Sequence, residues 1–435
     1  MWWIKMHAGW ANRVFVLLFT AVAFPFILFG QSVLEKEQQF YAAVAAGNVA
    51  PAKALLRDLL NEDSLGIYRL IDPIESLFLP GDVRSMATPV RAELVTLLRV
   101  YTLGELHDPA GPAVWLRSKA MLALRYPAQF RDEYRPLLQA AIEADPFGCP
   151  LLLYQRWLAA SVTRFKEAAL PLEVVAQDWA RASTLLYSRE IRVTQEAVRT
   201  ARTTQGIALQ LRNAIPDCKK LVQVYGKAIR KETLSSASCA DFLTLYALQD
   251  CNTASDLWQP AFDCAAQQAP QAWLYRLAAT ETQNAKDFRQ SLSHWQTAAN
   301  LETDPALQAA DLLHQAQVQA MLGEFRAARH TIKQASLLHP RWGEPHLQLA
   351  DLYLEGAATC NLSLFDQKAI YWLLIDLCYT AKNVDPGALQ VANQRIYTYQ
   401  QLMPSREEAA FKGLKEGDTW PLKCWMGTVT TVKMN

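Results

Sequence analysis

The chain has 435 residues, of which 51% are hydrophobic and 20% charged, and its formal net charge at pH 7 is +1. This is the composition of a globular protein that is long enough for a continuous solenoid core or for about two to three ordinary domains. The balanced charge excludes an overall attraction to nucleic acid or to an anionic membrane, and we interpret the dispersed basic residues of segment 156–232 as a solvated helix face.

The N-terminus has the pattern of an export signal. A short basic segment precedes sixteen apolar residues, VFVLLFTAVAFPFILF at positions 14–29, and a small residue and a polar stretch follow. The apolar run is just shorter than the roughly 17 residues that span a bilayer, and Pro25 shortens the good helix further. We therefore predict that residues 1–30 are a cleaved signal peptide and that the protein reaches the periplasm or cell envelope. The alternatives are a retained inner-membrane anchor over 14–29 and a buried helix of a cytosolic fold.

Residues 31–271 are predicted to form an irregular array of helices that is similar to the repeats further along the chain. The segment QAAIEADP places Ala141 and Pro146 five residues apart, which is also the spacing in the repeats that follow. Further helices are predicted at 151–165, 171–188, 190–214, 217–231 and 239–249. The first three are either degenerate repeats or ordinary amphipathic helices, and in both cases the class is all-α.

Export makes the eight cysteines candidates for disulfides. The last two of these helices would form an antiparallel hairpin that places Cys218 beside Cys251, so this is the most plausible pair. Cys360 and Cys378 are not expected to pair, because one precedes a late helix and the other lies about eight residues into it, beyond the roughly 7 Å reach of a disulfide. The alternative is that all eight cysteines are buried and reduced.

Three tandem repeats are predicted in residues 272–403. Between Ala309 and Pro340 the sequence reads as a helix, a Gly turn, a second helix and a closing Pro. Small or apolar residues, with two Gln among them, occupy the marked positions of the roughly 34-residue tetratricopeptide (TPR) repeat. From Ala309 as position 1, the residues at these positions include Leu312, Ala316, Gln319, Ala328, Ile332, Ala335 and Pro340. The same pattern starts at Ala272 and at Gly343, and a repeat needs such stacked neighbours.

The third repeat contains an insertion, and two further elements follow it. Pro386 lies twelve residues beyond the position that an unbroken count gives, so residues 355–366 are predicted to be an inserted loop. A helix over 388–402 is expected to cap the solenoid. Within the tail, residues 404–435, the stretch TWPLKCWMGTVTTVK is rich in β-branched and aromatic residues and predicts a short β-hairpin. The predicted fold is therefore an all-α, TPR-like solenoid with a hairpin-like tail.

Motifs of catalysis and cofactor binding are absent from the sequence. There is no G-x-S-x-G, H-E-x-x-H, G-x-G-x-x-G, Walker A, EF-hand or C-x-x-C motif. Stacked helices would allow His294 and His314 to meet, but no carboxylate is placed to orient them and no histidine pair has i, i+4 spacing. We therefore predict no enzyme, no cofactor and no metal site.

The order of these features resembles a group of exported bacterial TPR proteins of unassigned biochemical role. The resemblance covers roughly residues 80–435 and rests on CKKLVQVYGKAI, on the three repeats, and on a Cys-containing insertion before KAIYWLLIDLCYTAKNVDP. Its most specific parts are YW at 371–372, DP at 385–386, GLKEGD at 413–418, and CW with TTVK near the end. It implies export and a helical-repeat fold, and it implies no reaction and no catalytic residue.

The resemblance also implies which side chains line the concave groove of the repeats. In TPR arrays, positions 2, 5, 9, 12 and 13 of each first helix face this groove. Here these positions hold Trp273, Arg276, Thr280, Gln283, Asn284, Ala310, Leu313, Gln317, Ala320, Met321, Glu344, Leu347, Asp351, Leu354 and Glu355. The groove is therefore polar and cationic at one end, apolar in the middle and acidic at the other end.

Function is predicted from this groove. The main hypothesis is an exported, non-catalytic scaffold that binds an extended peptide or a partner helix of another cell-envelope protein, and that meets the membrane only through an uncleaved N-terminal segment. The alternative is a cell-envelope glycan-binding protein or enzyme that uses the Trp-rich surface, since the chain has 13 Trp. A further alternative is that the groove face merely packs on the chain's own helix 388–402.

Overall fold

The computed structural model describes residues 35–61 without 37, 44–45 and 47, residues 101–102, and residues 112–434 without 128–129, 131, 252–255 and 269. The predicted signal peptide, residues 1–30, lies outside these ranges. Within them, no helix combines the length and the hydropathy needed to cross a membrane. The chain divides into two compact units, Met1–Trp157 and Leu158–Asn435, and this division falls inside the segment predicted as one helical array.

The described part of the first unit is helical. Its elements are α2 (Val49–Asn61), α5 (Pro112–Arg125) and α6 (Tyr134–Ala144), and α7 (Leu151–Lys166) begins in it and crosses the boundary. Helix α5 packs against α6. The Arg117 guanidinium fixes the turn after α6, because it donates to the Gly148 carbonyl at 3.1 Å and pairs with Asp145 at 3.4 Å.

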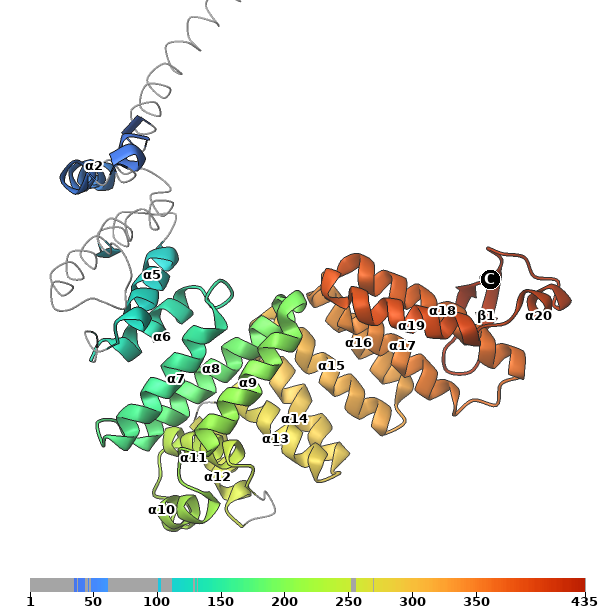
Figure 1. Cartoon of the computed structure of the whole chain (residues 1–435). Coiled ribbons are helices and arrows are strands. Elements are labelled where there is room, and N and C mark those ends of the chain that lie inside the picture. The colour runs from blue at the N-terminus through green and yellow to red at the C-terminus, as the bar shows by residue number, and fades with distance from the viewer. Residues whose placement is uncertain are drawn as a thin grey trace, which may run out of the picture. The chain divides into compact units, whose positions relative to one another are not determined.

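The second unit contains a run of helices, then the three predicted repeats, then the tail (Figure 1). The first run is α8 (Leu172–Arg192), η3 (Thr194–Glu196), α9 (Ala197–Arg212), α10 (Cys218–Arg230), α11 (Ser236–Leu248) and α12 (Trp258–Gln268). The repeats are α13 (Ala272–Asn284) with α14 (Phe288–Leu301), α15 (Pro305–Met321) with α16 (Phe325–Leu338), and α17 (Glu344–Ala357) with α18 (Leu364–Val384). Then come η4 (Pro386–Ala388), α19 (Leu389–Leu402), α20 (Arg406–Phe411), β1 (Thr419–Leu422) and β2 (Thr428–Thr431).

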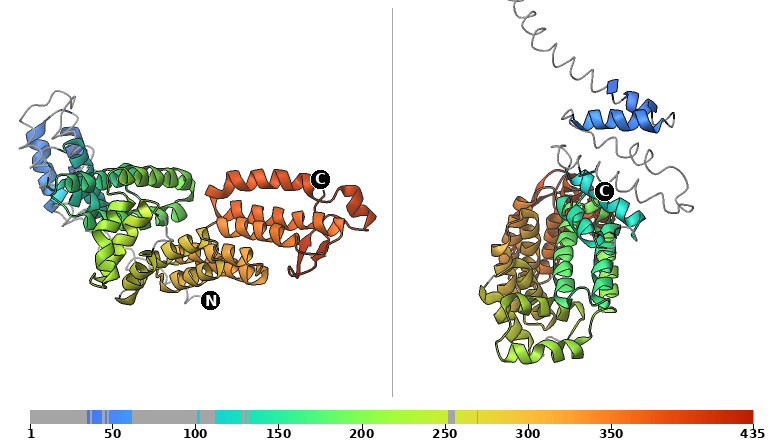
Figure 2. Two further views of the ribbon diagram at one scale, coloured as in Figure 1. Left: turned by 90° about the horizontal axis from the view of Figure 1, so that it is seen from below. Right: turned by 90° about the vertical axis from the view of Figure 1, so that its left-hand side faces the viewer.

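The repeat positions form the core of the solenoid. Ala328 and Ala335 of α16 are fully buried, and Ile332 between them is 3% exposed. Gly323 makes the turn from α15 to α16 with a φ of +78°, a conformation that residues with a Cβ rarely adopt. Each helix from α13 to α18 packs against the next, so the pairs stack in sequence order (Figures 1 and 2). The all-α, TPR-like solenoid predicted from the sequence is confirmed.

The predicted inserted loop at 355–366 is wrong. Helix α17 continues to Ala357 and α18 starts at Leu364, so only six residues connect them. Seven of the twelve additional residues lengthen the second helix, which has 21 residues where α16 has 14. The physical reason lies in the segment's own sequence: the Ser363 side chain accepts a hydrogen bond from Asp366 N at 3.1 Å and starts a helix whose Ala369 and Ile370 are buried. A count of extra residues gives their number and not their conformation.

The tail closes the end of the repeat core. Strands β1 and β2 form an antiparallel pair in which Pro421 faces Val429, and a ribbon of two strands tolerates Pro because each strand is an edge. The Trp425 ring stacks on Tyr353 with the ring centroids 5.4 Å apart. Gly356 is required beneath it, because a Cβ there would lie 2.4 Å from Cζ2 of Trp425.

Six of the eight cysteines form disulfides. The structure joins Cys218 to Cys251, Cys239 to Cys264 and Cys360 to Cys424, and it leaves Cys149 and Cys378 as buried thiols. The alternative that all eight cysteines are reduced is therefore wrong. The pairs Cys239–Cys264 and Cys360–Cys424 were not predicted, although Cys239 and Cys264 lie on the successive helices α11 and α12.

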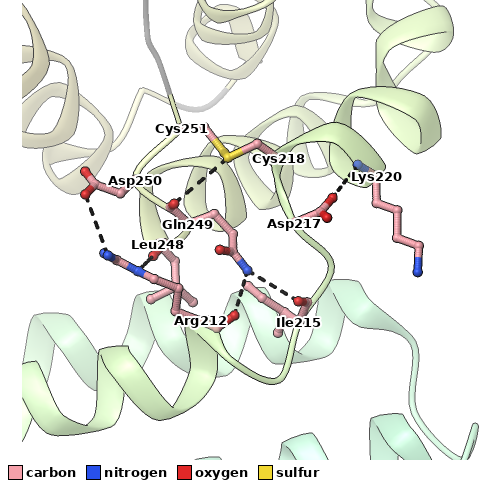
Figure 3. Close-up of a disulfide and its surroundings, with 9 residues drawn as sticks. All are labelled: Arg212, Ile215, Asp217, Cys218, Lys220, Leu248, Gln249, Asp250 and Cys251. Atoms are coloured by element: carbon pink, nitrogen blue, oxygen red, sulfur yellow. Dashed lines mark hydrogen bonds and ion pairs between the residues drawn. A yellow bond between two sulfur atoms is a disulfide. The ribbon is translucent and has the colours of Figure 1, made fainter.

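The bond between Cys218 and Cys251 ties the start of α10 to the residues after α11 (Figure 3). Gln249 secures the same corner, since its Nε2 donates to the Arg212 carbonyl at 2.8 Å and to the Ile215 carbonyl at 3.3 Å. These two carbonyls belong to the end of α9 and the turn after it, where helix geometry leaves acceptors free. Three helix ends are thereby held together.

Candidate partner-binding groove

Eight of the fifteen predicted groove residues line two separate cavities. Trp273, Arg276 and Thr280 of α13 line the first, of about 390 Å³, together with side chains of α8, α9 and α11; we call it the aromatic cavity. The second, of about 340 Å³, lies between α15 and α17; we call it the acidic cavity. Its lining consists of Ala316, Gln317, Ala320, Met321, Ile332, Gln348, Asp351, Leu352 and Glu355.

Two indoles and two guanidinium groups give the aromatic cavity its character. Trp179 of α8 and Trp273 of α13 both line it, and Arg212 and Arg276 are its only charged lining residues in the described part of the chain. The hydroxyl of Thr280 also lines it and donates to the carbonyl of Arg276 at 2.9 Å, so that its lone pairs remain available as acceptors.

An ion-pair network holds Arg276 in place. Its Nε donates to Oδ1 of Asp311 at 2.7 Å, its second terminal nitrogen reaches Oδ2 at 2.8 Å, and Glu302 accepts a further bond. Burial raises the pKa of the Asp311 carboxyl to about 6, although the Arg276 guanidinium acts in the opposite direction. Burial alone lowers the pKa of Arg276, but Asp311 and Glu302 raise it by more, so Arg276 stays protonated. The carboxylates of Asp311 and Glu302 therefore neutralise the positive charge of Arg276.

The chain itself covers the first part of the groove. Ile191, near the end of α8, packs against Ala306, Leu307 and Ala310 of α15. Arg192 pairs with Asp304 at 2.5 Å. The groove position Ala310 is consequently closed by α8, a helix that sequence analysis did not connect with the groove.

Helix α19 has a different role from the one in the packing alternative. It packs mainly against α18, as a cap does, and it reaches the groove through Arg395. Nη1 of Arg395 donates to Oδ1 of Asp351 at 2.6 Å and to the Leu347 carbonyl at 3.2 Å. Burial raises the pKa of Glu344, which lies on α17 with Leu347 and Asp351, and the nearby Arg395 partly offsets this rise.

Besides Ala310, two further predicted groove residues do not reach solvent. Leu313 is 2% exposed and Leu347 is 3% exposed, and both belong to the core of the repeats. The reason is that α15 and α17 pack side by side, so an apolar side chain at position 5 contacts the neighbouring first helix. Asn284, by contrast, is exposed at the end of α13.

A chain of side-chain contacts connects the two cavities. The Tyr187 hydroxyl, in the aromatic cavity, lies 3.1 Å from Nε2 of His314, and Nδ1 of His314 lies 3.3 Å from Oε1 of Gln317, in the acidic cavity. Burial lowers the pKa of His314, so the ring is neutral and has one donor and one acceptor nitrogen. Nε2 of Gln283 lies 3.9 Å from the sulfur of Met321, which adds a second link between α13 and α15.

The histidines considered for a metal site lie in separate environments. His314 stacks on Trp295 at 4.6 Å between ring centroids, whereas His294 packs edge-on against Phe262 at 5.3 Å. The described residues contain no group of three or more His, Cys, Asp or Glu that is arranged to hold a metal ion. Neither cavity has a nucleophile next to a general base in its lining.

No protein-family model matches the sequence, and no curated protein matches it either. Similar solved structures include the crystal structure of the APC/C hetero-tetramer Cut9–Hcn1, with 16% identity over 82% of this chain and 74% of that chain. The crystal structure of yeast Tom70 is similar with 14% identity over 88% of this chain and 92% of that chain. Both TM-scores are 0.28, so the fold assignment rests on the helix pairs described above.

Proposed function

We propose that this protein is an exported, non-catalytic scaffold of the cell envelope that binds a peptide or partner helix of another protein in the groove between α15 and α17. One observation carries the proposal. Gln317, Met321, Asp351 and Glu355, which repeat spacing places on successive first helices, line one open cavity. Met321 is 55% exposed there, and an exposed apolar side chain beside polar groups is typical of a protein interaction site.

Export is supported independently of the groove. Six cysteines in three disulfides fit an oxidising compartment, because cytosolic proteins rarely keep structural disulfides. The basic and apolar pattern of residues 1–30 agrees with this location.

Crosslinking in living cells tests the proposal. A photoreactive residue at Gln317, which is exposed in the acidic cavity, should capture a defined envelope protein. Met321→Glu should abolish capture because it places a charge on the apolar wall. Leu337→Glu is the matched control, since Leu337 is 79% exposed on α16 outside both cavities and its replacement should leave capture unchanged. Capture that survives Met321→Glu would exclude this groove as the binding site.

Glycan binding is the second candidate, and the aromatic cavity is the observation that favours it. Trp179 and Trp273 offer ring faces for sugar stacking, and hydroxyls such as that of Ser183 offer acceptors. No carboxylate lines this described cavity, so binding is favoured over hydrolysis. Quenching of tryptophan fluorescence by envelope glycan fragments in the wild type, and its loss in Trp179→Ala, would support this candidate over the scaffold.

A further inference from the structure

We propose that the acidic cavity selects partner segments with a Lys or Arg side chain, which enters the cavity between Met321 and Glu355 while a neighbouring apolar side chain of the segment covers Met321. The inference rests on the proposed function and adds the chemistry of the partner. Asp351 and Glu355 are the only charged residues that line this cavity in the described part of the chain. A cationic guest is therefore complementary in charge, and an anionic one is disfavoured.

Of the two carboxylates, Glu355 is the one available to a partner. Asp351 is already paired with Arg395 of α19 at 2.6 Å. Glu355 is exposed and makes no ion pair with another residue of the described part of the chain. The Arg395 contact already places one guanidinium group at this edge of the cavity. A second cation from a partner would meet Glu355 one helical turn further along α17.

The rest of the lining fits the stem of a long basic side chain. Ala316, Ala320 and Leu352 form apolar walls, and an aliphatic stem of three or four methylene groups packs against such surfaces while its charged end stays in contact with polar groups. Oε1 of Gln348 is buried in this lining and accepts no hydrogen bond within the described residues. A donor from a guest, after a small rotation of the amide, would satisfy this acceptor.

Peptide display tests the inference. Random peptides displayed on phage are selected against the purified full-length protein, against Glu355→Arg, and against Glu416→Arg, which makes the same charge change at an exposed residue outside the cavity. The wild type and Glu416→Arg should enrich peptides with Lys or Arg next to an apolar residue. Glu355→Arg should lose this enrichment. Basic peptides that remain enriched on Glu355→Arg would overturn the inference.

The affinity of one selected, fluorescently labelled peptide tests the inference quantitatively. Glu355→Gln should weaken it about two- to fivefold, the range of an exposed ion pair, and replacement of the peptide's basic residue by Met should remove the sensitivity to this variant. Peptides that require Met321 but carry no basic residue would overturn this inference and leave the proposed function intact. If Met321→Glu weakens the binding of none of the selected peptides, both this inference and the proposed function fail.

Discussion

At the scale of single residues, one buried carboxylate connects three parts of the chain. Asp385, which follows α18 and is 3% exposed, accepts hydrogen bonds from the Thr194 hydroxyl at 2.6 Å, from Gly343 N at 3.0 Å and from Gly387 N at 2.8 Å. These donors belong to η3, to the start of α17 and to η4. Asp385 and Pro386 form the DP pair in the resemblance to exported TPR proteins, and the structure shows that the Asp of this pair links three segments of the chain.

Replacement of Asp385 by Ala should therefore destabilise the protein. The change removes three hydrogen bonds to a carboxylate and leaves the buried amide of Gly343 without a partner, so we expect a loss of about 2 to 4 kcal/mol in the free energy of unfolding. Urea denaturation measures it. Asp263→Ala is the control, because Asp263 is exposed and, among the described residues, bonds only Gln259 of its own helix. Equal midpoints for Asp385→Ala and the wild type would contradict the prediction.

A second residue-scale prediction concerns pH. Burial raises the pKa of Asp241 to about 6, and the nearby Glu173 adds to the rise while Gln177 opposes it. Between about pH 4 and pH 6 the folded protein then holds a proton that the unfolded chain has released, so this group's contribution to stability falls as pH rises through that window. Asp241→Asn should flatten the dependence there. Urea midpoints measured across the window test it, and parallel curves for both proteins would contradict it.

At the scale of elements, sequence spacing predicts the helix pairs well. The helix expected at 388–402 is α19, Leu389–Leu402, and the helices expected at 151–165 and 217–231 are α7 and α10. Small residues and Pro at fixed distances act locally, so they can be read without a structure. The conformation of residues 355–366 could not be read in this way, because a helix extension and a loop add the same number of residues.

Ala328 tests the argument from spacing. It is fully buried between the helices of the second repeat, so Ala328→Leu should force them apart and reduce the free energy of unfolding by about 1 to 3 kcal/mol. Ala327→Leu makes the same change at the adjacent, exposed position and should have little effect. Thermal unfolding of both variants provides the comparison. A similar melting temperature for the two would show that the small residue has no packing role.

The connection between α17 and α18 is predicted to stabilise the fold through Cys360. Its disulfide with Cys424 spans 64 residues, and the loss of such a cross-link costs about 2 to 4 kcal/mol. Cys360→Ser and Cys424→Ser should therefore each destabilise the protein, and the double variant should be no worse than either single one. Urea denaturation of the three variants gives the cycle. Additive losses would mean that the two side chains act separately.

At the scale of the whole molecule, the groove was only partly predictable. Repeat positions correctly identify Gln317, Met321 and Glu355 as lining residues, because the face on which each side chain lies depends only on its position along its own helix. The packing of α8 against α15 was not predicted. Tyr187 and His314 are 127 residues apart in the sequence, and such a contact leaves no local sequence pattern. The tryptophans of the YW and CW pairs in the resemblance prove to be packing residues: Trp372 is fully buried, and Trp425 stacks on Tyr353.

Export makes a prediction about the whole chain that its thiols can test. An exported protein should begin after about residue 30 and should contain three disulfides, so a thiol reagent applied under denaturing conditions without reductant should modify only Cys149 and Cys378. Full modification of all eight cysteines should require prior reduction. Mass spectrometry of protein from the envelope fraction reads the N-terminus and the modified sites together. Recovery from the cytosol with Met1 intact and all eight thiols reactive would contradict export, because it would place the chain in a reducing compartment where these cross-links do not form.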